Sequence, residues 1–132
     1  MDFSKLNETE ICNRVVCFDN VKGPDGKTLD GVKFYLKGSG SEAAQAKSSL
    51  YQKMTLGQIN NLTIQEQYDM TTNKLIACTD NWEGIDMEGK PFPFNESNAR
   101  FLYSNKGFAW LRLQIISFVD DSSIFFQNAN ES

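Results

Sequence analysis

Two short runs of β-branched and aromatic residues lie near the start of the chain, and turn-forming residues separate them. Residues 14–18 read Arg-Val-Val-Cys-Phe, and residues 32–37 alternate apolar and polar side chains for most of their length, which is typical of strands. Pro24, Asp25 and Gly26 favour a turn between them. This order predicts an antiparallel β-hairpin over residues 14–37. Because a hairpin alone is only marginally stable in water, its apolar face needs a covering layer of helices.

Helical periodicity in the rest of the chain supplies that layer. Ser41 is a suitable N-cap for a helix that carries small and large apolar residues at helical spacing. Thr63 is expected to cap a second helix, and Glu66, three residues later, completes a capping box. The apolar stripe expected on this second helix consists of Ile64, Tyr68, Thr71, Leu75, Cys78 and Trp82.

A proline-rich connector separates these helices from the last part of the chain. Residues 91–94 read Pro-Phe-Pro-Phe, which requires extended backbone. Asn95 or Ser97 can cap a short helix after it. Residues 108–119 form the most apolar segment of the chain and predict a helix that is buried between other elements.

The sequence therefore predicts a single α+β domain, in which an N-terminal antiparallel β-hairpin packs on a bundle of about four helices. Residues 1–13 are expected to form an N-terminal arm and residues 14–37 the hairpin. Residues 41–126 are expected to be mainly helical, and residues 127–132 to form a polar tail.

The chain of 132 residues contains no histidine. This excludes Ser-His-Asp and Cys-His relays as well as zinc sites that need imidazole. The 13 basic residues against 17 acidic residues give a formal net charge of −4. Nucleic-acid binding usually requires a basic surplus on one face, so we expect no nucleic-acid partner. No stretch approaches about 20 consecutive apolar residues, so no membrane span is expected.

The cysteines indicate the redox environment. Cys12, Cys17 and Cys78 are odd in number and contain no CxxC pair, so neither a disulfide framework nor a zinc site made of cysteine alone is expected. The first residues show neither a basic lead nor a following apolar run, so no secretory signal is expected. Free thiols in a reducing cytoplasm are the expected state.

Motifs that would carry chemistry are weak. Residues 38–41 (Gly-Ser-Gly-Ser) lie between a predicted strand and helix like a phosphate-binding loop, but they lack the third glycine and the Lys-Ser/Thr ending of such loops. Carboxylates gather in the first loop and around Trp82, but no spacing selects a catalytic pair or a calcium loop. We therefore expect no catalytic residues, no cofactor and no metal, and we predict that the protein is not an enzyme.

Aromatic residues are the more informative set, since the chain has ten Phe, four Tyr and two Trp. Both tryptophans fall on expected apolar stripes, where core packing is the favoured interpretation. Phe92 and Phe94 lie in the proline-rich connector, and Phe125 and Phe126 lie next to the polar tail. Each pair can either pack inward or form an exposed apolar patch that binds a partner. These four residues are the predicted partner-binding candidates.

Several short motifs occur in an order that resembles the small tail assembly chaperones of long-tailed bacteriophages and prophages. The first half carries Pro-Asp-Gly at residues 24–26, Gly-Val-Lys-Phe-Tyr-Leu-Lys-Gly at residues 31–38, and Ser41 at a helix start. The second half carries Trp-Glu-Gly-Ile at residues 82–85, Gly-Lys-Pro-Phe-Pro-Phe at residues 89–94, Asn-Ala-Arg at residues 98–100, and an apolar helix after them. The resemblance covers roughly residues 15–126.

This resemblance implies a non-enzymatic role in the host bacterial cytoplasm. Such chaperones bind the long tape measure protein, keep its hydrophobic helices soluble, and help to recruit major tail tube subunits around it. They are absent from the finished virion and have no catalytic residues. The alternative is a structural tail component, such as a tube, terminator or connector subunit, which would be present in purified virions. Whether the chain forms a homo-oligomer stays open.

Overall fold

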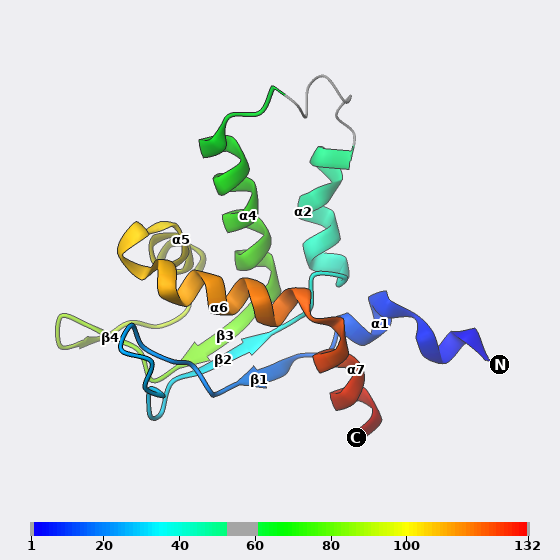
Figure 1. The fold of residues 1–132 in the computed structure, drawn as a ribbon, viewed down its shortest axis with the longest axis horizontal. Helices are drawn as coiled ribbons and strands as arrows, with labels where there is room; N and C mark the ends of the chain where they lie inside the picture. Colours follow the sequence, from blue (N-terminus) through cyan, green and yellow to red (C-terminus); the bar gives the residue numbers. More distant parts are fainter. Residues whose placement is uncertain (1, 53–60, 132) are drawn as a thin grey trace.

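A three-stranded antiparallel sheet in the order β1-β2-β3 is the base of the computed structural model, which describes residues 2–52 and 61–131. Its strands are β1 (Val16–Phe18), β2 (Lys33–Leu36) and β3 (Thr79–Glu83). Helix α6 (Ala109–Asp120) crosses the sheet, and α2 (Glu42–Gln52) and α4 (Ile64–Cys78) pack side by side beyond it (Figure 1). The predicted α+β fold class is confirmed.

The predicted hairpin is present. β1 pairs antiparallel with β2, so that Val16 lies opposite Leu36 and Phe18 lies opposite Phe34. Phe34 and Leu36 are fully buried, whereas Tyr35 between them lies on the other face and is half-buried. This alternation gives the sheet one face toward the helices and one face toward solvent.

The prediction for the end of the second long helix was wrong, because Trp82 is not a helical residue. α4 ends at Cys78, and the next five residues form β3, which pairs with β2 so that Trp82 lies opposite Phe34. Cys78 and Trp82 are both buried, one at the end of a helix and the other in a strand. Their helical spacing of four is therefore a coincidence. The strand depends on a partner far earlier in the chain, which local periodicity does not reveal.

Capping residues place α4 and α2 as predicted. Thr63 Oγ1 accepts a hydrogen bond from Glu66 N at 3.0 Å, and Glu66 Oε1 accepts one from Thr63 N at 3.3 Å. The capping box is therefore complete on both sides. Ser41 Oγ accepts a hydrogen bond from Ala44 N at 3.3 Å at the start of α2.

The buried face of α4 differs from the predicted stripe at Ile64 and at Thr71, since the neighbouring Thr72 is the buried threonine. Ile64 is 87% exposed and contributes nothing to the core. The buried residues of this helix are Thr72, Leu75 and Cys78. Only the second half of α4 therefore packs fully into the domain.

Helix α6 supplies most of the apolar layer over the sheet. Its buried side chains Leu111, Ile115 and Val119 belong to one cluster with Phe34 and Leu36 of β2. A helix is present over nearly the predicted residues, but the prediction that it is buried between other elements is wrong, because only one face is covered and Leu113 on the other is 65% exposed. Among the described residues, no helix is long and apolar enough to cross a membrane.

Both ends of the chain are more ordered than predicted. Helix α1 (Glu8–Cys12) packs against α7 (Ser122–Glu131), and together with β1 they enclose a second apolar cluster. The buried members of this cluster are Ile11, Cys12, Val16 and Phe125. Residues 2–13 are therefore not simply an arm, since α1 contributes the buried Ile11 and Cys12, whereas the single turn η1 (Phe3–Leu6) before it has no buried residue. Residues 127–131 continue α7 instead of forming a separate tail.

Candidate protein-binding surface

Trp82 holds the proline-rich connector against the core. Its side chain is almost completely buried, and its Nε1 donates a hydrogen bond to Phe92 O at 2.7 Å. The Phe92 ring stacks on the indole at a centroid distance of 6.0 Å, and the Phe94 ring meets it edge-on at 5.2 Å. Phe92 and Phe94 stay half-buried, so each keeps part of its ring at the surface. The two predicted candidates of this segment are therefore placed together and remain accessible.

Aromatic rings continue from Phe92 across the surface. Phe92 contacts Phe101 at 6.1 Å, Phe101 contacts Phe108 at 6.5 Å, and Phe108 contacts Trp110 at 6.2 Å, all with inclined ring planes. Such distances and tilts are those of favourable aromatic pairs. Phe101 is 47% exposed, and the other three rings are half-buried. We refer to Phe92, Phe101, Phe108 and Trp110 as the aromatic row.

The aromatic row ends at an apolar hollow of about 240 Å³. Phe108 and Trp110 belong to both features, and Leu29 and Met87 form part of the remaining wall. Of the twelve residues that line the hollow, ten are apolar, one is a glycine, and one, Asp86, is charged. We refer to this feature as the apolar hollow. The row and the hollow are joined through Phe108 and Trp110, and together they place partly exposed apolar side chains next to one another.

Two glycine-containing turns meet at the wall of the hollow, and the absence of a side chain at Gly84 allows their close approach. Gly31 and Gly84 have φ values of +80° and +78°, which side chains other than glycine rarely adopt. A Cβ atom on Gly84 would lie 2.0 Å from Gly31 O. This approach brings Leu29 and Val32 on one turn next to Ile85 on the other. Glycine at position 84 is therefore required for the shape of the hollow.

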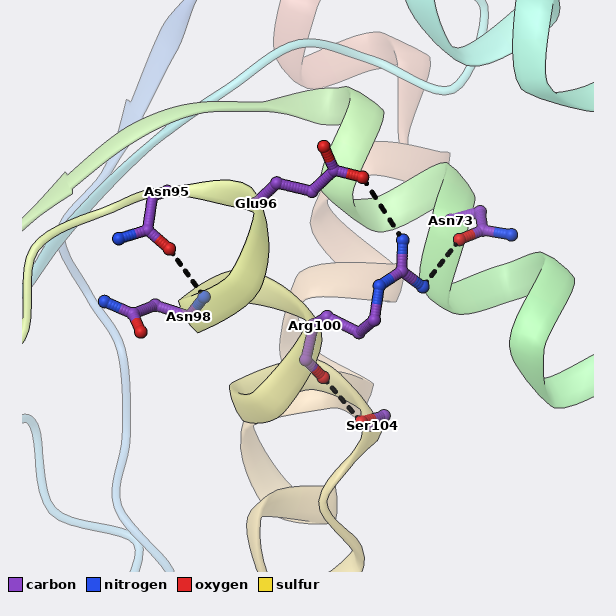
Figure 2. A network of polar contacts seen from close by, with 6 residues as sticks. All are labelled: Asn73, Asn95, Glu96, Asn98, Arg100 and Ser104. Carbon is purple, nitrogen blue, oxygen red and sulfur yellow. Dashed lines mark hydrogen bonds and ion pairs between the residues drawn. The ribbon is translucent and has the colours of Figure 1, made fainter.

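Polar contacts fix helix α5 (Glu96–Ser104), which carries Phe101. At its start, Asn95 Oδ1 accepts a hydrogen bond from Asn98 N at 2.7 Å, as predicted for an N-cap at this position. Arg100 donates to Asn73 Oδ1 on α4 at 2.9 Å and forms an ion pair with Glu96 at 3.4 Å (Figure 2). The bond to Asn73 connects α5 to α4, and the ion pair with Glu96 holds the Arg100 side chain along α5.

A buried arginine fixes the other end of α5. Arg112 on α6 donates to Tyr103 O at 3.0 Å, to Thr72 Oγ1 at 2.6 Å and to Tyr68 O at 3.0 Å. Its guanidinium lies 3.7 Å from the centre of the Tyr68 ring, and Tyr68 OH donates to Ser104 O at 3.1 Å. Burial lowers the pKa of Arg112, but an arginine remains charged in proteins. Arg112 therefore connects α6, which carries Trp110, to α5, which carries Phe101, and to α4.

The second pair of predicted candidates lies elsewhere in the fold. Phe125 is completely buried, with its ring 5.7 Å from that of Phe118, and Phe126 packs half-buried against the same cluster. Of the two alternatives for this pair, Phe125 takes inward packing, because its ring lies in the cluster with Ile11 and Cys12 of α1 and near the backbone at Gly38. The four predicted phenylalanines therefore do not form one surface.

A shallower hollow of about 420 Å³ lies between β1, α6 and the start of α7. The rings of Phe18 and Phe118 stack in its wall at 4.7 Å, and Leu113, which is 65% exposed, lies at its edge. We refer to it as the β1–α6 hollow. It is lined by different residues from the apolar hollow.

The chemistry of the remaining side chains is limited. Within residues 2–52 and 61–131, no group of three or more histidine, cysteine or acidic side chains is placed to hold a metal ion. Burial raises the pKa of Cys78 to about 12, and burial also raises the pKa of Cys12. Because the thiolate is the reactive form of cysteine, neither buried thiol is a ready nucleophile near neutral pH.

The sequence indicated only the start of this surface. The alternation with prolines points to Phe92 and Phe94, whereas periodicity predicts a buried helical stripe for Phe108 and Trp110 and a short helix for Phe101. These three rings come together through tertiary packing, which leaves no local sequence signal. Comparison of the chain with protein-family models, curated proteins and solved structures found no match.

Proposed function

We propose that this protein is a tail assembly chaperone that binds apolar helices of a phage tape measure protein through the aromatic row and the apolar hollow. The observation that carries the proposal is the row of four partly exposed aromatic rings, with Phe101 at 47% exposure, which ends at an apolar hollow. Surfaces of this kind on single domains commonly bind other proteins. The motif order described above supports the choice of family.

The size of the hollow favours a protein side chain as its occupant. Its volume of about 240 Å³ is below the range of about 300–1,000 Å³ that is typical of small-molecule sites. In helix-in-groove binding, apolar side chains one turn apart insert into neighbouring apolar sites. Four residues of an α-helix rise about 6 Å, which is close to the 6.1 Å and 6.5 Å between neighbouring rings around Phe101. An amphipathic helix is therefore a suitable partner.

Recruitment of tail tube subunits requires a second surface. The β1–α6 hollow is separate from the aromatic row, and Leu113 at its edge is exposed. A chaperone that holds the tape measure protein on one surface and a tube subunit on another brings these two partners together. On this proposal the protein acts in the cytoplasm of the host bacterium and leaves before the virion is complete.

Co-expression tests the proposal directly. With the tape measure protein encoded in the same genome as partner, this chain should move most of that protein from the insoluble to the soluble fraction and co-purify with it. Expression of the tape measure protein alone is the control. Unchanged solubility without co-purification would contradict the chaperone function. Detection of this chain in purified virions would instead favour a structural tail component.

A further inference from the structure

We propose that Asp86 makes the apolar hollow selective for cationic partner helices, in which a lysine or arginine lies beside the apolar side chain that enters the hollow. This inference rests on the proposed function, because it specifies the partner of the same surface. The aromatic row is uncharged and cannot select a partner by the sign of its charge, whereas a carboxylate beside the hollow can.

Asp86 is the one charged residue among the twelve that line the hollow, and it is exposed. In the part of the chain that the structure describes, its carboxylate has neither a hydrogen bond nor an ion pair. Asp86 begins strand β4 (Asp86–Met87), which pairs with β5 (Lys90–Pro91). In this pairing Pro91 lies opposite Asp86, and the cationic residue Lys90 lies opposite Met87 instead. The carboxylate is therefore available to a partner.

A second carboxylate, Asp30, lies close in sequence to the wall but is not among the residues that line the hollow. Asp30 is exposed and lies in the turn between Leu29 and Val32, both of which line the hollow. The close approach of the Gly31 and Gly84 backbones brings this turn to the segment that carries Asp86. Asp86 is therefore the one carboxylate in the lining, and Asp30 lies on the neighbouring turn.

An apolar wall with a carboxylate at its edge suits a partner helix that has a lysine or arginine next to an apolar side chain. Lysine and arginine place their methylene groups along apolar surface and keep the charged end in water, where a carboxylate can pair with it. An acidic residue at the same place would meet Asp86 and lose affinity through like-charge repulsion. The expected partner is thus an amphipathic helix with basic residues flanking its apolar stripe.

Two synthetic peptides test the inference with the full chain. Each is an amphipathic helix of about 20 residues with the same leucine stripe, and the residues that flank the stripe are lysine in one peptide and glutamate in the other. Fluorescence anisotropy should give a lower Kd for the lysine peptide. Asp86→Asn should weaken binding of the lysine peptide about two- to fivefold, as expected for one exposed ion pair. Asp86→Lys should reverse the order of the two peptides.

Two controls distinguish the loss of the Asp86 carboxylate from a change in the overall charge or in the stability of the protein. Glu10→Gln removes one acidic charge on α1, whose neighbours belong to the other apolar cluster, and should leave both Kd values unchanged. The thermal midpoint of Asp86→Asn should match that of the wild type, since the side chain is exposed. Equal binding of both peptides, or no effect of Asp86→Asn, would overturn the charge selectivity and leave the proposed function intact. If neither peptide binds the wild-type protein, the binding surface itself is contradicted.

Discussion

Gly84→Ala should destabilise the fold by about 3 kcal/mol or more and lower the thermal midpoint by about 10 °C. The backbone of Gly84 has a φ of +78°, which is strained for alanine, and the added Cβ would lie 2.0 Å from Gly31 O and 2.8 Å from Gly31 C. These are backbone atoms, so relief requires one turn to move away from the other. The same movement would open the wall of the apolar hollow. Thermal unfolding followed by circular dichroism measures the effect.

Gly89→Ala is the matched control for this prediction. Gly89 also has a positive φ, +79°, but a Cβ at this position meets nothing within 4 Å. Its substitution should therefore cost only the backbone strain, about 1–2 kcal/mol. A loss of stability at Gly84 no larger than the loss at Gly89 would show that the close contact of the two turns does not support the fold.

Phe101→Ser should weaken binding of the lysine-flanked helical peptide at least about tenfold, because the central ring of an apolar binding surface usually contributes more than its neighbours. Phe101 contacts both Phe92 and Phe108, so its removal interrupts the aromatic row in the middle. About half of its side chain is already in solvent. The thermal midpoint should consequently fall by only a few degrees. Anisotropy titration and thermal unfolding give the two quantities.

Leu113→Ser provides the comparison on the other surface. Leu113 is more exposed than Phe101 and lies at the β1–α6 hollow, so its replacement removes a similar apolar group from a different place. Binding of the peptide should stay within about twofold of wild type. Strong loss of binding in Leu113→Ser with normal binding in Phe101→Ser would move the helix-binding site to the β1–α6 hollow.

Local signals account for the parts of the fold that the sequence predicts well. Alternation of side chains defines β2, the pair of Thr63 and Glu66 defines the start of α4, and Asn95 defines the start of α5. Each of these depends on residues within a few positions of one another. By contrast, β3 exists because its backbone pairs with β2, and α1 exists as a packed helix because α7 covers it. Such long-range partners leave little trace in short windows of sequence.

The predicted binding residues also differ in whether local sequence or long-range packing decides their exposure. Phe92 and Phe94 remain accessible because prolines keep their segment extended and Trp82 holds it at the surface. Phe125 is equivalent to them by composition, but α7 packs against α1 and the ring lies inside the cluster that the two helices share. Whether an aromatic residue faces solvent depends on the packing of its whole helix, which the identity of its immediate neighbours does not determine.

Hydrogen exchange on the complex with the tape measure protein is the most direct test of the central claim, that the aromatic row and the apolar hollow form the binding surface. Amide exchange in this chain, measured by mass spectrometry with and without the partner, should slow mainly in residues 84–94 and 101–111, which carry these features. Exchange in α1 and α7 should stay unchanged. Protection confined to other segments, with residues 84–94 and 101–111 unaffected, would contradict the claim.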